Sequence, residues 1–173
     1  MPVEELRARI REVPDFPKPG ILFYDITTLL KVGPSFREAI DLMLEPFLET
    51  PVDVVVGMES RGFIFSAPMA YRLGVGLVPV RKLGKLPHET LSIEYALEYG
   101  SNTLEIHRDA IAEGQRVLIV DDLLATGGTV RGTVDLVRRL GGEIAGLSFL
   151  VELLFLKGRD RLKEFPVSSV IQY

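Results

Sequence analysis

The segment 117–129 constrains the fold of this chain more than any other part of the sequence. It begins with a short apolar run, residues 117–120, of the kind that is buried on both faces of a parallel sheet. Downstream of it, apolar residues recur at helical spacing from Val130 to Leu140. The segment therefore predicts a strand, a loop and a helix in immediate succession.

The loop of this unit combines two carboxylates with two glycines. Asp121 and Asp122 follow the apolar run, and Gly127 and Gly128 precede the helix. Backbone N–H groups point outward at the positive end of a helix, and glycines carry no β-carbon that would keep a ligand away. Such a loop suits a phosphate, but the two carboxylates would repel it unless they face ribose hydroxyls or a divalent cation. Neither the lysine-bearing P-loop nor the GxGxxG pattern of dinucleotide sites is present.

The rest of the chain repeats the alternation of strands and helices. Further apolar runs predict strands at residues 52–56, 76–80, 145–151 and 167–171. Helical patterns lie at residues 3–13, 34–47, 62–73 and 157–164. This alternation predicts an α/β fold with a mostly parallel, five-stranded, doubly wound sheet, in which right-handed crossovers place both glycine turns at one rim.

Residues 84–106 break the alternation and predict a β-ribbon. Apolar and polar residues alternate on both sides of a turn at residues 100–102, which is typical of two paired strands. Gly84 and Pro87 at the root of the ribbon would let it close as a flexible lid that excludes water. His88 is expected to be exposed there and to have no catalytic role.

Composition and charge exclude several classes of protein. The chain has 173 residues, which predicts one domain spanning residues 1–173 with a full core. Its net charge of −4 comes from interspersed charges, so neither nucleic acid nor a membrane surface is an expected partner. No apolar run approaches the ~20 residues that cross a bilayer, and a cytoplasmic protein is expected. The absence of cysteine excludes disulfides, thiolate catalysis and cysteine-ligated zinc.

The strand, the paired acids and the run Ala-Thr-Gly-Gly-Thr resemble the 5-phosphoribosyl-1-pyrophosphate (PRPP) loop of the type I phosphoribosyltransferases. The resemblance implies that Asp121 and Asp122 bind the ribose 2′- and 3′-hydroxyls. It also assigns the 5′-phosphate to the loop residues Ala125, Thr126, Gly127, Gly128 and Thr129. A Gly-Gly pair after a strand is otherwise more often a simple turn.

A second loop, Glu59-Ser60-Arg61-Gly62, resembles the pyrophosphate loop of the same family. There, backbone amides hold the leaving group, and the guanidinium of Arg61 would approach its charge as a catalytic and PRPP-binding residue. The resemblance also implies a cis peptide between Glu59 and Ser60. Considered alone, the motif would be a helix N-cap with a solvated arginine.

Three cations follow the strand at residues 76–80 and match a further part of this family. The family's matching Arg-Lys pair contacts pyrophosphate partly across a dimer interface, so the resemblance assigns PRPP binding to Arg81, Lys82 and Lys85 and implies a homodimer. Composition alone would describe these residues as a solvated rim. Their place outside the carboxyl end of a strand is where open α/β sheets bind ligands.

Two motifs are similar to the adenine-specific members of the family. Residues 16–27 resemble their N-terminal hood, here residues 1–33, and the resemblance assigns adenine binding to Leu22, Phe23 and Tyr24. Phe23 would stack on the base, and its two neighbours would offer main-chain contacts, although Tyr24 stands where the family has arginine. The motif Leu-Glu-Tyr-Gly at 97–100 makes Glu98 the general acid at N7 of the base and Tyr99 a PRPP-binding residue. The alternatives are an edge strand for the hood motif and a solvated glutamate for Glu98.

The resemblance implies an enzyme that converts adenine and PRPP into AMP and pyrophosphate through an oxocarbenium-like transition state. Mg²⁺ would be held mainly through PRPP or pyrophosphate and water, without a metal site of the protein itself. Another phosphoribosyltransferase, for a 6-oxopurine or orotate, would keep the same PRPP loop, but related 6-oxopurine enzymes carry an acid where this chain has Ala125. A regulator without activity would lose Glu98 or Arg61, and both are present.

Overall fold

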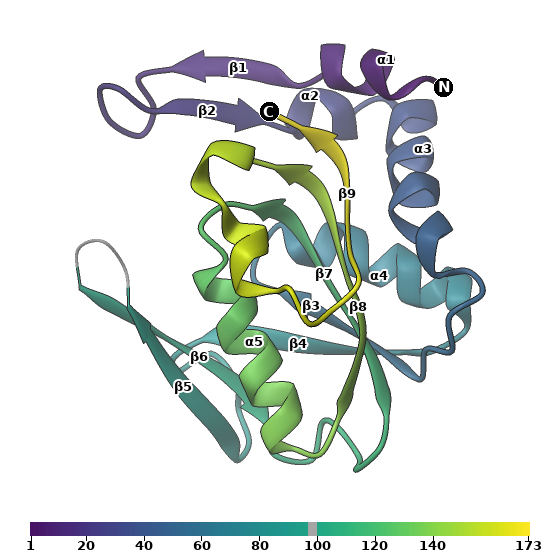
Figure 1. Ribbon diagram of the computed structural model, residues 1–173, viewed down its shortest axis with the longest axis vertical. Helices are drawn as coiled ribbons and strands as arrows, with labels where there is room; N and C mark the ends of the chain where they lie inside the picture. Colours follow the sequence, from purple (N-terminus) through teal and green to yellow (C-terminus); the bar gives the residue numbers. More distant parts are fainter. Residues whose placement is uncertain (97–99) are drawn as a thin grey trace. The chain divides into compact units, whose positions relative to one another are not determined.

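A seven-stranded sheet lies at the centre of the larger of two units, Met43–Tyr173; the smaller unit is Met1–Leu42. The structure is a computed structural model that describes residues 1–96 and 100–173. In order across the sheet, the strands are β5 (Thr90–Ala96), β6 (Ser101–His107), β4 (Gly76–Lys82), β3 (Val54–Met58), β7 (Arg116–Leu124), β8 (Glu143–Glu152) and β9 (Val167–Gln172) (Figure 1). The run from β4 to β9 is parallel throughout, which confirms the predicted parallel sheet.

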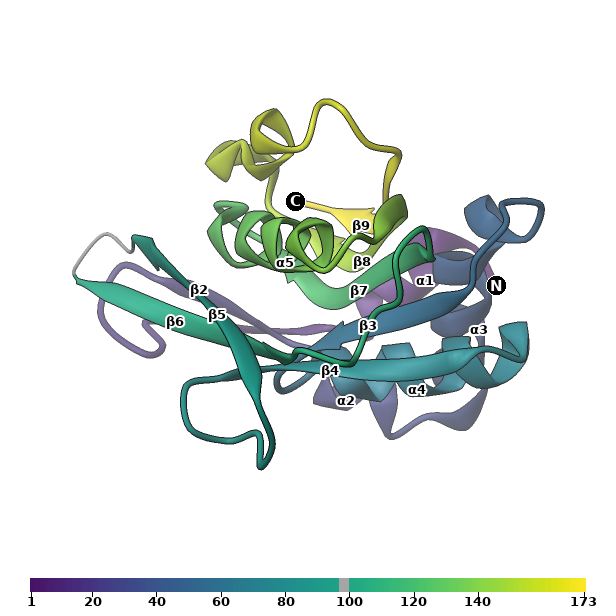
Figure 2. The ribbon, with the colours of Figure 1, turned by 90° about the horizontal axis from the view of Figure 1, so that it is seen from below.

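Two helices cover opposite faces of the parallel strands, α4 (Gly62–Leu73) and α5 (Gly128–Arg139) (Figure 2). The strand β3 is buried along its whole length, as expected for a strand covered on both faces. On the α5 side, the packed core includes Val56, Val80, Ile119, Val134 and Val137. On the other side, a β-carbon at Gly57 would collide with the hydroxyl of Ser66, so glycine is what lets α4 approach β3. The crossovers thus leave both predicted glycine turns at the carboxyl ends of the strands.

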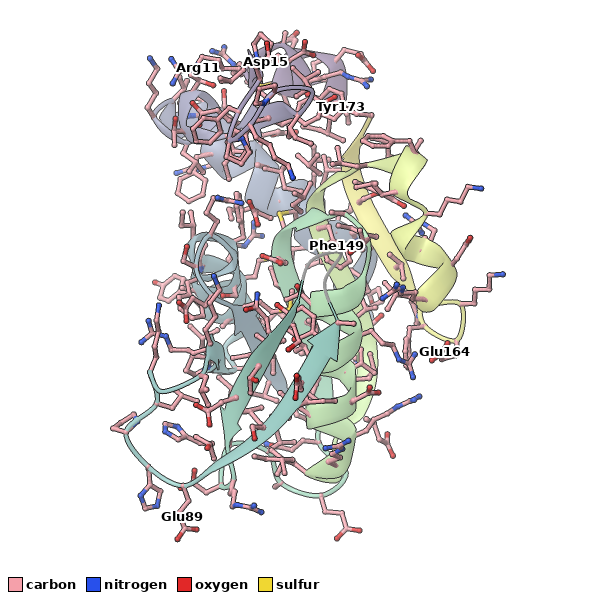
Figure 3. The ribbon with its side chains drawn as sticks, turned by 90° about the vertical axis from the view of Figure 1, so that its left-hand side faces the viewer. Arg11, Asp15, Glu89, Phe149, Glu164 and Tyr173 are labelled. Carbon is pink, nitrogen blue, oxygen red and sulfur yellow. The ribbon has the colours of Figure 1, made fainter. Side chains whose placement is uncertain are left out.

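The predicted ribbon is present and extends the edge of the sheet. β5 and β6 pair in antiparallel fashion, and β6 continues the sheet by pairing with the end of β4. The buried carboxylate of Glu105 accepts hydrogen bonds from Gly84 N at 2.7 Å and from Thr90 Oγ1 at 2.6 Å, which ties the root of the ribbon together. His88 is exposed, as predicted. Glu89 lies nearby, at the turn that leads into β5 (Figure 3).

One prediction from the sequence is wrong in the smaller unit, Met1–Leu42. The helix expected over residues 3–13 ends early, because α1 spans only Val3–Ala8 and Arg11–Pro14 forms strand β1, paired antiparallel with β2 (Leu22–Asp25). Over so few residues helical and alternating patterns are hard to tell apart, and strand pairing decided the outcome. Arg11 and Asp25 face each other, with Nη2 and Oδ2 2.6 Å apart. Hydrogen bonds from Thr27 and Arg11 lower the pKa of Asp25 to about 2.

Three further helical segments follow β2 in the chain. They are α2 (Thr27–Leu30), α3 (Gly33–Leu44) and the 3-10 turn η1 (Glu45–Phe47), so the predicted helix at 34–47 is confirmed except for its last turn. Among the described residues, no helix has both the length and the apolarity needed to cross a bilayer.

The second correction concerns the C-terminal connection between β8 and β9. The helix predicted at 157–164 is replaced by two 3-10 turns, η2 (Leu154–Leu156) and η3 (Gly158–Arg161). Between them Lys157 adopts a left-handed conformation with φ 54°, which interrupts helical geometry. The turns bring residue 158 against the loop that follows β7, a contact that matters for the site described next.

Candidate active site

A pocket of about 380 Å³ lies at the carboxyl ends of β3 and β7. Its walls come from the loop after β3, from the end of β7, from the first turn of α5 and from the ribbon. The sequence-predicted residues that line it are Glu59, Ser60, Arg61, Lys82, Asp121, Asp122, Ala125, Thr126, Gly127, Gly128 and Thr129. The fold therefore brings both predicted glycine turns and one of the three predicted cations to a single cavity.

The paired acids have different partners. The buried carboxylate of Asp122 accepts a hydrogen bond from Arg61 Nε at 2.6 Å, so Arg61 joins the loop after β3 to the end of β7. The carboxylate of Asp121 accepts a hydrogen bond from the backbone N–H of Asp122 at 2.8 Å. Burial, reinforced by the neighbouring charge of Asp122, raises the pKa of Asp121 well above its usual range. The pocket thus holds one neutralised carboxylate and one that is poorly stabilised when ionised.

The start of α4 packs directly on Asp121. A β-carbon at Gly62 would lie 2.8 Å from Asp121 Oδ1 and 3.1 Å from the carbonyl oxygen of Val120. Because glycine has no β-carbon, the first position of this helix leaves space for the carboxylate of Asp121. The sequence showed Gly62 only as the end of the second loop motif, without this role.

The first turn of α5 is open toward the pocket. Gly127 has φ 86° and ends the loop, and no described side chain caps the helix that begins at Gly128. The first N–H groups of a helix have no partner within the helix, and their partial positive charge attracts anions. This is the geometry that the loop sequence predicted for a phosphate.

The carboxylate of Glu59 organises the predicted cations. Its side chain is only 6% exposed and accepts hydrogen bonds from Arg81 Nε at 3.2 Å, from the backbone N–H of Lys82 at 3.0 Å and from Lys85 Nζ. Burial acts to raise the pKa of Glu59, but these contacts outweigh it and lower the pKa below the usual value. Arg81 and Lys85 are thus held beside the loop by Glu59, whereas Lys82 lines the pocket. The Glu59–Ser60 peptide is cis, as predicted.

The remaining predicted site residues belong to the smaller unit or lie outside the described residues. Leu22, Phe23 and Tyr24 belong to β2 in the smaller unit, where Phe23 packs edge-to-face on Phe16 with ring centroids 5.1 Å apart. Glu98 and Tyr99 lie outside the described residues. The roles predicted for these five residues stay predictions.

The ribbon contributes pocket residues that sequence reasoning missed, namely Tyr95, Asn102 and Leu104. The hydroxyl of Tyr95 accepts a hydrogen bond from Thr129 Oγ1 at 3.4 Å, and its ring lies 3.6 Å from where a β-carbon of Gly128 would be. The sequence did contain a signal for Tyr95, because the alternation along β5 places it on the same face as Leu91 and Ile93. What the sequence did not show is that this face packs on the first turns of α5.

The backbone of Gly158, which does not line the pocket, packs closely against the predicted phosphate loop at Ala125 and Gly127. A β-carbon at Gly158 would collide with the carbonyl oxygen of Ala125, and one at Gly127 would lie 2.8 Å from the carbonyl oxygen of Gly158. Both positions therefore require glycine, because neither neighbour is a flexible side chain.

We expect Gly158→Ala to displace the loop at Ala125 and to raise the KM for the phosphate-bearing substrate several-fold. The collision of the added β-carbon with the backbone at Ala125 should also lower the free energy of unfolding by about 1–3 kcal/mol. Steady-state kinetics and thermal unfolding of the variant measure both effects. Gly33→Ala is the control, because a β-carbon at Gly33 meets no atom within 4 Å. Unchanged kinetics in Gly158→Ala would show that the loop does not depend on this contact.

Comparisons with known proteins agree on one family. The family model described as phosphoribosyl transferase domain matches residues 25–170. The adenine phosphoribosyltransferase of Chloroflexus aurantiacus is 60% identical over 98% of this chain and 98% of its own length. The enzyme of the same name from Acetivibrio thermocellus is 58% identical over 98% of this chain and 99% of its own.

Solved structures show the same similarity in three dimensions. The crystal structure of adenine phosphoribosyltransferase from Thermoanaerobacter pseudethanolicus superposes with a TM-score of 0.96 at 54% identity, covering 99% of each chain. The Saccharomyces cerevisiae enzyme, solved with an imino-altritol bisphosphate and adenine, gives a TM-score of 0.91 at 42% identity and covers 97% of each chain.

Proposed function

The chain belongs to the phosphoribosyltransferase family, among its adenine phosphoribosyltransferases, and we propose that the pocket at the ends of β3 and β7 binds its PRPP. These enzymes of purine salvage form AMP and pyrophosphate from adenine and PRPP. The observation that carries the proposal is the meeting of two carboxylates with the open first turn of α5 in one cavity. Carboxylates accept hydrogen bonds from ribose hydroxyls, and the helix N-terminus attracts the 5′-phosphate.

Within this pocket, Asp121 and Asp122 orient the ribose, and residues 125–129 hold the 5′-phosphate. The two carboxylates also lie where positive charge develops on the sugar as the bond to pyrophosphate breaks. Asp121 is suited to this role because few protein groups stabilise its charge before the ligand arrives. The N9 atom of adenine then attacks the ribose carbon that pyrophosphate leaves.

The departing pyrophosphate is held by the loop after β3 and by cations beside it. The backbone of Glu59, Ser60 and Arg61 presents amides to it, and the guanidinium of Arg61 approaches its charge. Lys82 lines the same pocket, and Glu59 keeps Arg81 and Lys85 close to the loop. Opposing charge at the leaving group lowers the barrier to its departure.

The donor set of the pocket fits Mg²⁺ bound mainly by the substrate. Among the described residues, no cluster of three or more potential ligands exists for a metal, and Arg61 already neutralises Asp122. Mg²⁺ commonly keeps several waters and binds substrate phosphates with little help from the protein. When bound, it would neutralise pyrophosphate charge as that group leaves.

Base recognition is assigned to residues of the smaller unit and of the lid. We propose that residues 1–33 act as a hood in which Phe23 stacks on adenine, while Leu22 and Tyr24 offer main-chain contacts. Residues 84–106 would form the lid, with Glu98 as the general acid at N7 and Tyr99 as a PRPP ligand. Hood and lid would then serve one phosphoribosyltransferase domain of residues 1–173.

We propose that the reaction takes place in the cytoplasm, because the charges of PRPP keep it from crossing a bilayer.

We also propose a homodimer that uses the exposed face of α4 and β4. Large apolar side chains are exposed there, with Tyr71 at 87%, Leu83 at 65% and Leu77 at 41%. Large apolar side chains exposed to this degree are candidates for an interaction site. Sedimentation velocity of the purified protein should show a dimer, and Tyr71→Glu should shift it toward monomer, whereas a monomeric wild-type protein would contradict the proposal.

The reaction is tested by incubating the purified protein with PRPP, Mg²⁺ and one nucleobase at a time. Adenine should be converted to AMP with release of pyrophosphate, whereas hypoxanthine, guanine and orotate should react far more slowly. Ala125 supports this expectation, because it offers no proton to a 6-oxopurine. Preference for any of the other bases would overturn the adenine assignment.

A further inference from the structure

We propose that Arg161 is a ligand-binding residue that supplies side-chain charge to the 5′-phosphate held at the start of α5. The inference rests on the proposed binding of PRPP in this pocket. Arg161 ends η3, 32 residues after Thr129 at the end of the predicted phosphate loop, and none of the sequence motifs includes it. Its Nη1 atom lies 3.6 Å from the position that a β-carbon of Gly128 would occupy. The guanidinium therefore reaches the first residue of α5.

The position of η3 against α5 is set by backbone contacts and one arginine. Gly158, the first residue of η3, packs on the backbone of Ala125 and Gly127. At the other end, Arg131 of α5 donates a hydrogen bond to the carbonyl oxygen of Arg161 at 3.2 Å and also pairs with Glu164. Figure 1 shows η3 beside α5, and Figure 3 places Glu164 just beyond it. The 3-10 turn is thus fastened at both ends to the phosphate loop and its helix.

An ion pair between Arg159 and the buried carboxylate of Glu152 also holds this turn. Arg159 donates to Glu152 through Nε at 3.0 Å and through Nη2 at 2.7 Å, and Glu152 is 2% exposed. The hydrogen bonds from Arg159 lower the pKa of Glu152. Such a bidentate ion pair fixes the orientation of the guanidinium as well as its distance from the carboxylate. It directs the guanidinium of Arg159 toward Glu152, whereas Nη1 of Arg161 lies beside Gly128 of α5.

The charges around η3 indicate what Arg161 binds. Arg159 is neutralised by Glu152, and Arg131 is neutralised by Asp135 and Glu164. By contrast, no carboxylate of the described chain pairs with Arg161. An unpaired guanidinium beside the positive end of a helix raises the local potential unless an anion is present. A phosphate at Gly127 and Gly128 is the anion that this arrangement fits, because guanidinium groups bind phosphate oxygens with two N–H donors.

The test compares ligands that carry a 5′-phosphate with ligands that lack one. In Arg161→Gln, the Kd of ribose 5-phosphate and of AMP should rise on the order of tenfold, the effect of one partly exposed charge-assisted hydrogen bond. The Kd of adenosine and of pyrophosphate should stay within about twofold, and Arg161→Lys should recover part of the loss. Titration calorimetry at low salt measures all four, since salt screens exposed charges.

Arg139→Gln is the matched control, because Arg139 is exposed and ends α5 at the opposite end from Gly128. It makes the same change in net charge and should leave every Kd unchanged. Equal weakening of pyrophosphate and AMP in Arg161→Gln, or an equal effect of Arg139→Gln, would overturn the inference. If wild-type protein binds neither ribose 5-phosphate nor AMP, the proposed PRPP site itself fails and the inference falls with it.

Discussion

Glu98→Gln is expected to lower kcat on the order of 10²–10⁴-fold while leaving the binding of adenine and PRPP nearly unchanged. Attack by N9 draws electrons from the purine ring, and the ring must lose one proton as AMP forms. A carboxyl group hydrogen-bonded to N7 can exchange this proton with the base. Ala125 leaves the phosphate loop without a group that can transfer a proton, so this group must come from another element. The motif at 97–100 carries the carboxyl group that we assign to this role. Glutamine keeps the size of the side chain but cannot transfer the proton.

Single-turnover kinetics with separate measurements of Kd distinguish a chemical role from a binding role. Glu94→Gln is the control, because Glu94 is an exposed carboxylate on β5 that accepts a hydrogen bond from Ser101 Oγ. It should retain wild-type kcat. A Glu98→Gln variant with near-normal kcat in a chemistry-limited assay would show that this segment supplies no proton.

Asp121→Asn is expected to weaken PRPP binding by about 10–100-fold, the loss of one or two hydrogen bonds to a charged acceptor. The same change should stabilise the protein without ligand at neutral pH. Because the pKa of Asp121 is raised in the folded protein, the folded state binds its proton more tightly than the unfolded state does. Stability therefore falls as the pH rises from the unfolded pKa toward the raised one. Asparagine removes this cost and can still accept the N–H of residue 122.

Asp122→Asn separates the two effects. It should also weaken PRPP binding, but it leaves Arg61 without its charged partner at 2.6 Å, so the melting temperature should not rise. For the wild type, PRPP affinity should weaken as the pH falls toward the raised pKa of Asp121, and Asp121→Asn should lose this dependence. Calorimetric unfolding and PRPP titrations across pH measure both. A lower melting temperature in Asp121→Asn would contradict this account.

Local sequence determined the strand, loop and helix units of this protein. The paired acids, the glycines and the helix start of the first loop are neighbours in the chain, so hydrophobic periodicity and glycine placement were enough to predict their geometry. The same holds for the loop after β3. Right-handed crossovers then bring the two loops to one edge of the sheet, which is why the pocket itself was predictable.

Only the tertiary structure decided contacts between segments that are distant in sequence. The pairing of Arg61 with Asp122, the packing of Tyr95 on Gly128 and the approach of Gly158 to Ala125 each join different elements. No periodicity encodes such pairs, because they depend on how helices and ribbons pack on the sheet. For the same reason, β1 formed where a helix was expected, and η3 replaced a predicted helix against the phosphate loop. Short segments have weak local preferences, and packing with the rest of the chain determines their conformation.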